Sequence, residues 1–254
     1  MTAHVLGRKL RTFSTIIARC ANWPEVAAGR MGFVDRPVTV RLRDGLQIAS
    51  LRSLRTTFGE IFEPAIADLY AIRAERADLV VDVGANIGAF ACLAARCLPR
   101  AKVLAFEPST PHADQCERNV ALNRLENVVL HRAAVTRDGR EVHFQVNGDG
   151  GSSGLFIPGE REIVMPSVSL DAADFSASKR AFIKLDCEGA EGEIIDWICE
   201  NQSRLPASLK IACEWHGWCP IPMADAVALL VRHEFRVETP QLFDEQYLFA
   251  SRGW

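Results

Sequence analysis

Short runs of apolar and β-branched residues recur from residue 79 onward, and most are followed by a segment with helical spacing. The runs cover residues 79–83, 102–107, 127–131, 182–186 and 209–214. Apolar residues lie on one helical face over residues 88–98, 110–124, 194–198 and 222–233. Such alternation predicts an α/β fold, a mostly parallel sheet with helices on both faces. Residues 235–239 and 246–250 predict a closing hairpin.

The pattern before residue 76 is different. Residues 1–30 fit one or two helical stretches, broken near Trp23-Pro24. Alternating runs flank Arg43-Asp44-Gly45, and Asp-Gly in that position predicts a β-hairpin. The apolar spacing over residues 58–76 predicts a further helix. We therefore expect a small helical and hairpin extension over residues 1–75, followed by one large domain over residues 76–254.

Composition and charge limit the class of protein. The chain has 254 residues, 48% of them hydrophobic and 24% charged, as in soluble globular proteins. The net charge of −3 does not suit a nucleic-acid-binding protein. No apolar run reaches the ~18–20 residues of a transmembrane helix. Eight cysteines without a Cys-x-x-Cys pair favour reduced thiols and a cytoplasmic location. The sequence leaves homo-oligomerisation open.

Basic residues are concentrated at the N-terminus. Residues 1–58 contain ten Lys or Arg and three Asp or Glu, a balance of +7. This basic arm is either a solvated face or a surface that contacts an anionic partner.

The first predicted strand runs into the loop Asp82-Val-Gly-Ala-Asn-Ile-Gly88, where a helix is expected to begin. Glycine permits a positive φ and close ligand approach, and a helix N-terminus offers free N–H groups. The spacing Gly-x-x-x-Gly matches neither the dinucleotide fingerprint nor a P-loop. Asp82 suits a ligand with a cationic amino group, and Glu107, after the second strand, suits the two hydroxyls of a ribose. Together they favour S-adenosylmethionine.

Four motifs in succession resemble those of FkbM-type methyltransferases. They are Val81-Asp-Val-Gly-Ala-Asn-Ile-Gly, Ala105-Phe-Glu-Pro, Asn119-Val-Ala-Leu-Asn123 and Lys184-Leu-Asp-Cys-Glu-Gly-Ala-Glu191, within a region of resemblance at 36–216. The resemblance implies the class I methyltransferase fold, Rossmann-like, with a seven-stranded mostly parallel sheet and an antiparallel last strand. It also implies S-adenosylmethionine as methyl donor. The cofactor-binding residues so indicated are Asp82, Gly84, Ala85, Asn86, Gly88, Glu107, Ala134 and Asp186. Asn119 and Asn123 are interpreted as structural or exposed helix residues.

A reacting site is predicted where the fourth and fifth strands end. Methyl transfer requires the protein to align the acceptor and accept its proton. The candidate catalytic residues are Asp186, Glu188, Glu214 and His216. Glu191, in the first turn of the next helix, is interpreted as compensating the helix dipole.

Two metal sites are alternatives at the same place. Asp186, Glu214 and His216 are able to hold a divalent metal, although this is not the favoured interpretation. Cys213-x-x-His216-x-x-Cys219 offers only three ligands for zinc.

The predicted function is an O-methyltransferase that acts on a hydroxyl of a sugar, glycolipid, polysaccharide or secondary metabolite. The expected partner is thus a small-molecule or carbohydrate acceptor. The glycine-rich loop 148–154 and the aromatic residues Phe156, Trp215 and Trp218 are candidate acceptor contacts. N-methyl transfer, a non-catalytic S-adenosylmethionine-binding protein and a nicotinamide oxidoreductase remain alternatives.

Overall fold

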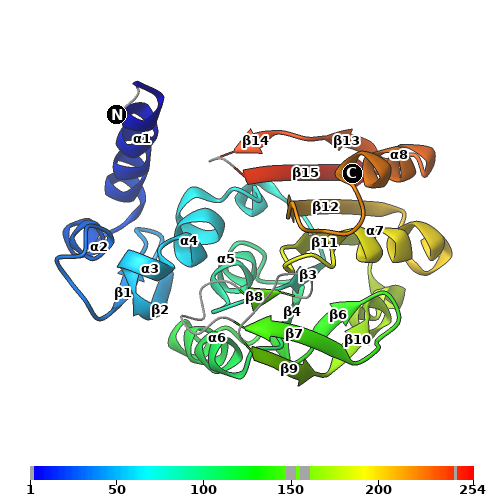
Figure 1. Ribbon diagram of the computed structural model, residues 1–254, viewed down its shortest axis with the longest axis horizontal. Helices are drawn as coiled ribbons and strands as arrows, with labels where there is room; N and C mark the ends of the chain where they lie inside the picture. Colours follow the sequence, from blue (N-terminus) through cyan, green and yellow to red (C-terminus); the bar gives the residue numbers. More distant parts are fainter. Residues whose placement is uncertain (1–2, 147–152, 155–160, 243–244) are drawn as a thin grey trace.

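A central sheet of seven strands organises the molecule (Figure 1). The computed structural model describes residues 3–146, 153–154, 161–242 and 245–254. The strand order is β13 (Arg236–Glu238), β15 (Glu245–Arg252), β12 (Ser208–Trp215), β11 (Arg180–Leu185), β3 (Leu79–Val83), β4 (Lys102–Phe106) and β5 (Val128–His131). Only β15 runs antiparallel to its neighbours β12 and β13, and the short β14 (Gln241–Leu242) also pairs with it. The predicted seven-stranded sheet of the class I methyltransferase fold is confirmed.

Helices cover both faces of this sheet because its strands bury side chains on both sides. In β3, Val81 packs into the same core cluster as α7 (Glu191–Glu200) and α8 (Met223–Arg232). Val80 instead packs into the cluster around α5 (Ala89–Cys97). Successive strand residues point to opposite faces, which explains the nearly continuous apolar runs in the sequence.

The predicted N-terminal helices and hairpin are present. The elements are α1 (Ala3–Arg19), α2 (Trp23–Arg30), β1 (Pro37–Arg41), β2 (Gln47–Ser53) and α3 (Leu54–Thr57). β1 and β2 are antiparallel, and Gly45 in their turn has a φ of +89°. The Asp44 carboxylate accepts the backbone N–H of Leu46 at 3.0 Å, which closes the turn.

Asparagine side chains hold both edges of the β1–β2 hairpin. Asn119, in α6 (Thr110–Leu122), accepts the N–H of Ala49 at 2.9 Å and donates to its carbonyl at 3.1 Å. Asn123 binds the N–H and carbonyl of Gln47 in the same way, at 2.8 and 2.6 Å. Asn22 does the same for the backbone of β1, with two contacts of 2.9 Å. Each amide therefore takes the place of a neighbouring strand, so the structural interpretation of the α6 asparagines is confirmed.

The prediction of one helix over residues 58–76 is wrong. The segment contains α4 (Gly59–Ile61), the π-helical turn η1 (Phe62–Ala67) and the 3₁₀ turn η2 (Ile72–Ala74). Asp68 adopts a φ of +55°, and its carboxylate accepts the backbone N–H of Ile72 at 2.9 Å. This local hydrogen bond competes with helix continuation. Tyr70 lies in the break and is buried.

Short strands and turns between β5 and β12 complete the fold. Their bounds are β6 (Ala134–Thr136), β7 (Val142–Val146), β8 (Ser153–Gly154), β9 (Arg161–Met165), β10 (Ser167–Ser169), η3 (Leu170–Ala173), η4 (Phe175–Ala177) and η5 (Gln202–Arg204). β6 pairs with β10, and β7 pairs with β8 and β9. Most of the predicted 148–154 loop lies outside the described residues, as does Phe156.

One hydrophobic cluster joins the N-terminal segment to the sheet. Ile16 and Ile48 belong to the same cluster as Phe90 and Phe182. The division into two parts at residue 75 stays a prediction. Within the described part of the chain, no helix is long and apolar enough to cross a membrane.

Candidate active site

The loop between β3 and α5 has no room for side chains at two of its glycines. Gly84 has a φ of +76°, and a Cβ there would lie 1.7 Å from the carbonyl oxygen of Asp186. Gly88 has a φ of +78°, and a Cβ there would lie 2.5 Å from the Sγ of Cys116. The Gly84 N–H also donates to the carbonyl of Phe106 at 3.0 Å. The loop is thus packed directly against the end of β11 and the middle of α6.

Glu107, at the end of β4, holds the loop from the other side. One of its carboxylate oxygens accepts the Asn86 N–H at 2.8 Å, and the other accepts the Ser109 N–H at 2.9 Å. Asn86 has a φ of +50°, and its side chain accepts the N–H of Ile87. Burial raises the pKa of Glu107 to about 7, although the two backbone donors oppose that shift. Glu107 therefore shapes the loop, and its role toward a ribose stays a prediction.

Two other predicted cofactor residues are buried in β6 and in the loop. Ala134 is 9% exposed, and its N–H donates to the carbonyl of Pro166 at 3.0 Å. Ala85 is 4% exposed, and its N–H donates to the carbonyl of Phe106 at 2.9 Å. Their contacts with a cofactor stay predictions.

Lys184 is a buried cation to which the sequence analysis gave no role. Parallel pairing of β3 and β11 places it opposite Asp82, with its Nζ 3.1 Å from that carboxylate. The Nζ also lies 3.4 Å from Asp186 and donates to the Gly84 carbonyl at 2.7 Å. Burial lowers the pKa of Lys184, but the two carboxylates raise it by more. The feature of the sequence that could have indicated this buried ion pair is the position of Lys184 within an otherwise apolar strand.

The burial of Asp82 bears on its predicted contact with the cofactor. Its side chain is fully buried. Burial raises its pKa above the ordinary value, and the charge of Lys184 offsets only part of that rise. The structure therefore gives Asp82 a partner inside the protein, and a contact with the cofactor amino group stays a prediction.

Two tyrosines bind the carboxylates at the strand ends. The Tyr70 hydroxyl lies 3.1 Å from Asp186 and 3.1 Å from Glu214. The Tyr247 hydroxyl lies 3.1 Å from the same oxygen of Glu214. Sequence reasoning missed both tyrosines because they are far from their partners along the chain; Tyr70 is 116 residues from Asp186.

His216 faces two acidic side chains and is held from behind by a third. Its Nδ1 lies 2.7 Å from the Glu191 carboxylate. Its Nε2 lies 3.8 Å from Asp186 and 3.7 Å from Glu188. Glu191 is fully buried and also accepts the N–H of Gly189 at 3.1 Å. The interpretation of Glu191 as a helix-dipole residue is therefore incomplete, because its main contact is His216.

Burial and mutual repulsion spread the pKa values of this cluster. Burial raises the pKa of Glu188 to about 7, and burial together with the charge of Asp186 raises that of Glu214 to about 8. Burial lowers the pKa of His216, but the Glu191 hydrogen bond and charge raise it to about 9. Burial raises the pKa of Asp186, but Lys184 and His216 bring it below its ordinary value. Near neutral pH, Asp186 is ionised and His216 carries a proton.

The structure brings one predicted set of metal ligands together. Ligand atoms of Asp186, Glu214 and His216 all lie within 4.8 Å of one another. Among the described residues, Cys213 is not part of this group; it lies in β12 and is fully buried in the hydrophobic cluster that contains α7 and α8. The zinc alternative therefore loses a ligand.

The two predicted aromatic contacts among the described residues, Trp215 and Trp218, lie in different surroundings. Trp215 is 5% exposed and belongs to the core. Trp218 is 42% exposed, and its ring lies 4.8 Å from that of His216. Trp218 is thus the aromatic side chain that borders the site.

The sequence model of one family, described as the Methyltransferase FkbM domain, matches residues 82–219. Methyltransferase sdnD of Sordaria araneosa is 52% identical over 44 residues. That match covers 17% of this chain and only 17% of the curated relative.

Several solved structures are similar at low identity. Precorrin-6y C5,15-methyltransferase from Geobacter metallireducens GS-15 is 17% identical, with 73% of this chain and 87% of that chain covered and a TM-score of 0.48. A SAM dependent methyltransferase from Aquifex aeolicus is 14% identical, with 77% and 93% covered and a TM-score of 0.44. An O-methyltransferase family protein from Burkholderia thailandensis is 12% identical, with 73% and 55% covered and a TM-score of 0.44.

Proposed function

We propose, from the premise that this chain belongs to the FkbM methyltransferase family, that it transfers a methyl group to a hydroxyl of a small-molecule or carbohydrate acceptor. Membership of the family implies S-adenosylmethionine as the donor. Sugars, glycolipids, polysaccharides and secondary metabolites are the acceptor classes proposed. Transfer to nitrogen is the alternative for the same site.

The residues present fit this cofactor. A sulfonium and an ammonium group both favour a site rich in carboxylates, and Asp186, Glu188 and Glu214 provide them. Because Gly84 has no Cβ, the loop backbone can lie directly against the end of β11. We assign the methionine end to the loop 82–88, the ribose to Glu107 and the adenine to the neighbourhood of Ala134. When bound, S-adenosylmethionine supplies a methyl group already activated by the positive sulfur.

The protein must then accept the proton of the acceptor hydroxyl, and His216 supports that role best. The observation that carries the proposal is the contact between His216 Nδ1 and Glu191, at 2.7 Å. A carboxylate on one ring nitrogen fixes the ring and stabilises the imidazolium that forms when the other takes up a proton. Nε2 faces Asp186 and Glu188, and Tyr70 and Lys184 hold Asp186 in place. We infer that Asp186 orients the acceptor and that His216 accepts the proton.

A metal-assisted reaction is the second candidate, supported by the convergence of Asp186, Glu214 and His216. In that case His216 would be a metal ligand and would not be available as a base. A divalent metal would lower the pKa of a bound hydroxyl, and Glu191 would orient the histidine ligand. Sensitivity to a chelator separates the two candidates.

The test is a screen of hydroxylated metabolites with labelled methyl donor, with and without chelator. We expect transfer to hydroxyl acceptors that survives the chelator. His216→Ala should keep its affinity for S-adenosylhomocysteine in calorimetry but lose about 10²-fold or more in turnover. His233→Ala, at the end of α8, is the matched control.

Three outcomes of this screen would count against parts of the proposal. Transfer to amines alone would refute the hydroxyl acceptor. Loss of activity in the presence of chelator would favour the metal-assisted reaction over His216 as the base. Nicotinamide binding without a response to S-adenosylhomocysteine would refute the cofactor.

All eight cysteines are free thiols. Since free thiols persist in reducing compartments, we propose a cytoplasmic location for the enzyme. The ratio of reduced to oxidised thiols in freshly isolated protein tests this.

A further inference from the structure

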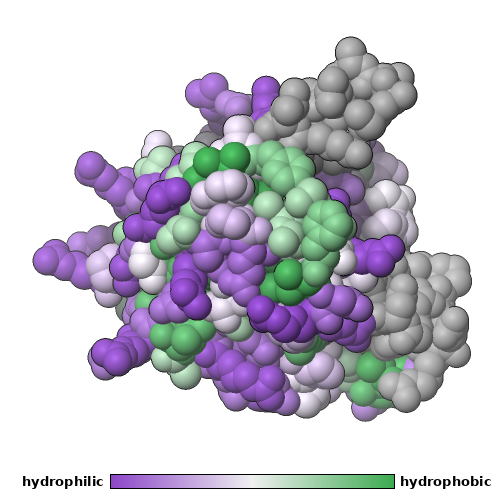
Figure 2. All heavy atoms as spheres, turned by 90° about the vertical axis from the view of Figure 1, so that its left-hand side faces the viewer, coloured by the Kyte–Doolittle hydropathy of each residue, from purple (hydrophilic) through white to green (hydrophobic). Residues whose placement is uncertain are grey.

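Four large apolar side chains are exposed within a short N-terminal stretch. Phe33 is 80% exposed, Met31 54%, Ile17 44% and Trp23 38%. Figure 2 looks onto the side of the molecule that carries α2 and the β1–β2 hairpin, where green side chains gather between purple ones. Phe33 and Met31 lie in the segment between α2 and β1, so they project from a connection rather than from a packed element.

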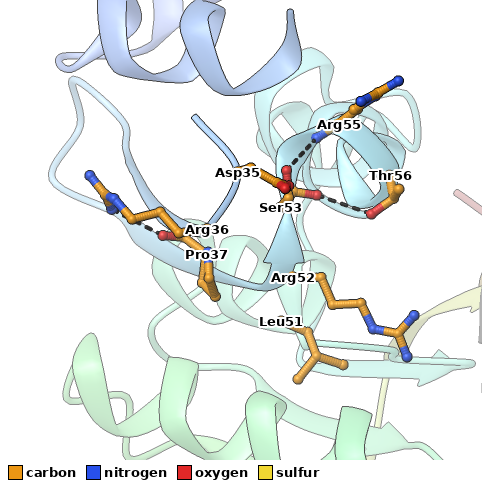
Figure 3. Close-up of a pocket in the computed structure, with 8 residues that line it drawn as sticks. All are labelled: Asp35, Arg36, Pro37, Leu51, Arg52, Ser53, Arg55 and Thr56. Carbon is orange, nitrogen blue, oxygen red and sulfur yellow. Dashed lines mark hydrogen bonds between the residues drawn. The ribbon is translucent and has the colours of Figure 1, made fainter. Parts of the chain in front are cut away.

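A cavity lined by three arginines lies beside this segment. Its volume is about 690 Å³, and it is lined by Arg36 before β1, Arg52 in β2 and Arg55 in α3, whose guanidinium groups point in different directions (Figure 3). Ser53 and Thr56 also line it, and Asp35 is its acidic lining residue. A Cβ at Gly32 would lie 3.4 Å from the side chain of Arg55. The exposed apolar segment and the cavity are therefore adjacent.

The charge around the segment is unbalanced. Residues 1–58 carry a balance of +7. Arg36 pairs with Glu25 at 3.0 Å, but both side chains are substantially exposed, at 63% and 34%. Arg30 lies over the ring of Phe58, with 5.3 Å between its guanidinium carbon and the ring centroid. Among the described residues, neither Arg30 nor Arg55 has an acidic partner.

We propose that this face docks on the surface of an anionic lipid bilayer. Phe33 and Met31 enter the interfacial region, and the arginines around the cavity bind lipid phosphates. Aromatic and basic side chains together are the combination that binds bilayer interfaces. A guanidinium group also matches phosphate geometry with two parallel hydrogen bonds.

A second copy of the chain fits this face less well. If two such faces met around a twofold axis, each copy would place its arginines near those of the other. Like charges brought together in that way oppose association. An anionic bilayer instead neutralises Arg30 and Arg55 and covers the exposed Phe33 at the same time.

Sedimentation of the full chain with phosphatidylcholine vesicles, with and without phosphatidylserine, tests the proposal. We expect binding only when phosphatidylserine is present, and weaker binding as salt is raised. The double variants Met31→Ser/Phe33→Ser and Arg36→Ser/Arg55→Ser should each reduce partitioning by about tenfold or more. Val231→Ser/Arg232→Ser on α8 makes the same kinds of change at an exposed site elsewhere and should bind as the original chain does.

A Phe33→Trp variant gives a second measurement. Its fluorescence should shift to the blue with phosphatidylserine vesicles and stay unchanged with phosphatidylcholine alone. Equal binding to neutral vesicles, no binding at low salt, or undiminished binding by both double variants would overturn the proposal. A dimer in sedimentation velocity that Phe33→Ser abolishes would also overturn it, by assigning the face to a second copy. None of these measurements depends on methyl transfer.

Discussion

His216 Nδ1 lies 2.7 Å from the carboxylate of Glu191, which is fully buried at the first residue of α7. The contact joins the segment after β12 to the helix that follows β11. It also leaves one ring nitrogen facing the acidic side chains of the site. The basicity and the orientation of His216 therefore depend on a residue that cannot itself reach solvent.

Glu191→Gln should shift the pH dependence of methyl transfer to lower pH. Glu191 raises the pKa of His216 to about 9, and a base is active only in its neutral form. Activity of the original chain should therefore rise with pH through about 9, and the variant should reach half-maximal activity about one pH unit lower or more. Profiles of kcat/KM measure the shift. Glu193→Gln is the control, because the partner of Glu193 is Arg140. An identical shift in this control, or no shift in Glu191→Gln, would contradict the role of His216 as a base tuned by Glu191.

Gly84→Ala should destabilise the fold strongly. Its Cβ would overlap the carbonyl oxygen of Asp186 at 1.7 Å, and its φ of +76° is unfavourable for alanine. We expect a loss of about 3 kcal/mol or more in the free energy of unfolding, or failure to fold. Gly217→Ala is the matched control, because a Cβ at Gly217 meets no atom within 4 Å. Equal melting temperatures for the two variants would show that the loop can move away from β11.

Lys184→Met should also be destabilising, for an electrostatic reason. The substitution leaves Asp82 fully buried without its cation, at a cost of about 3–5 kcal/mol. Adding Asp82→Asn should recover part of that loss, since the uncompensated charge is then removed. Denaturant unfolding measures both variants, with the exposed Lys102→Met as control. If the double variant is no more stable than the single one, loss of the Lys184–Asp82 ion pair is not the cause of the destabilisation.

Glu107→Ala should weaken binding of S-adenosylhomocysteine by about 1–3 kcal/mol, as expected for loss of a charge-assisted hydrogen bond. Because Glu107 also accepts the N–H of Asn86, thermal stability without cofactor should fall as well. Glu117→Ala, in an exposed pair with Arg132, is the control in calorimetry. A loss of stability with unchanged affinity would leave Glu107 as a loop residue only.

Affinity for S-adenosylmethionine should rise with pH. The pKa values of Glu188 and Glu214 are raised to about 7 and about 8, so these carboxyls are partly protonated near neutral pH. They become ionised as the pH rises through those values, and their negative charge then attracts the sulfonium. From about pH 6 to 9, we expect roughly tenfold tightening for the cationic cofactor and less for the neutral thioether S-adenosylhomocysteine. Parallel pH curves for the two compounds would contradict this.

The sheet could be predicted because strands buried on both faces leave continuous apolar runs, as in Leu79-Val-Val. The loop could be predicted because its glycines are required by local backbone geometry. The partners of the site residues could not, because Tyr70, Lys184 and Glu191 acquire their contacts only when distant segments pack together. The apolar spacing over residues 58–76 also gave no warning of the hydrogen bond at Asp68 that ends the helical turn.

Asn22, Asn119 and Asn123 cover strand edges of the N-terminal hairpin. An unpaired strand edge is a template on which another chain can add a strand. Here amide side chains occupy backbone donors and acceptors on the outer edges of both β1 and β2. Two copies of the chain therefore cannot extend this ribbon into a shared sheet unless these asparagines first release it.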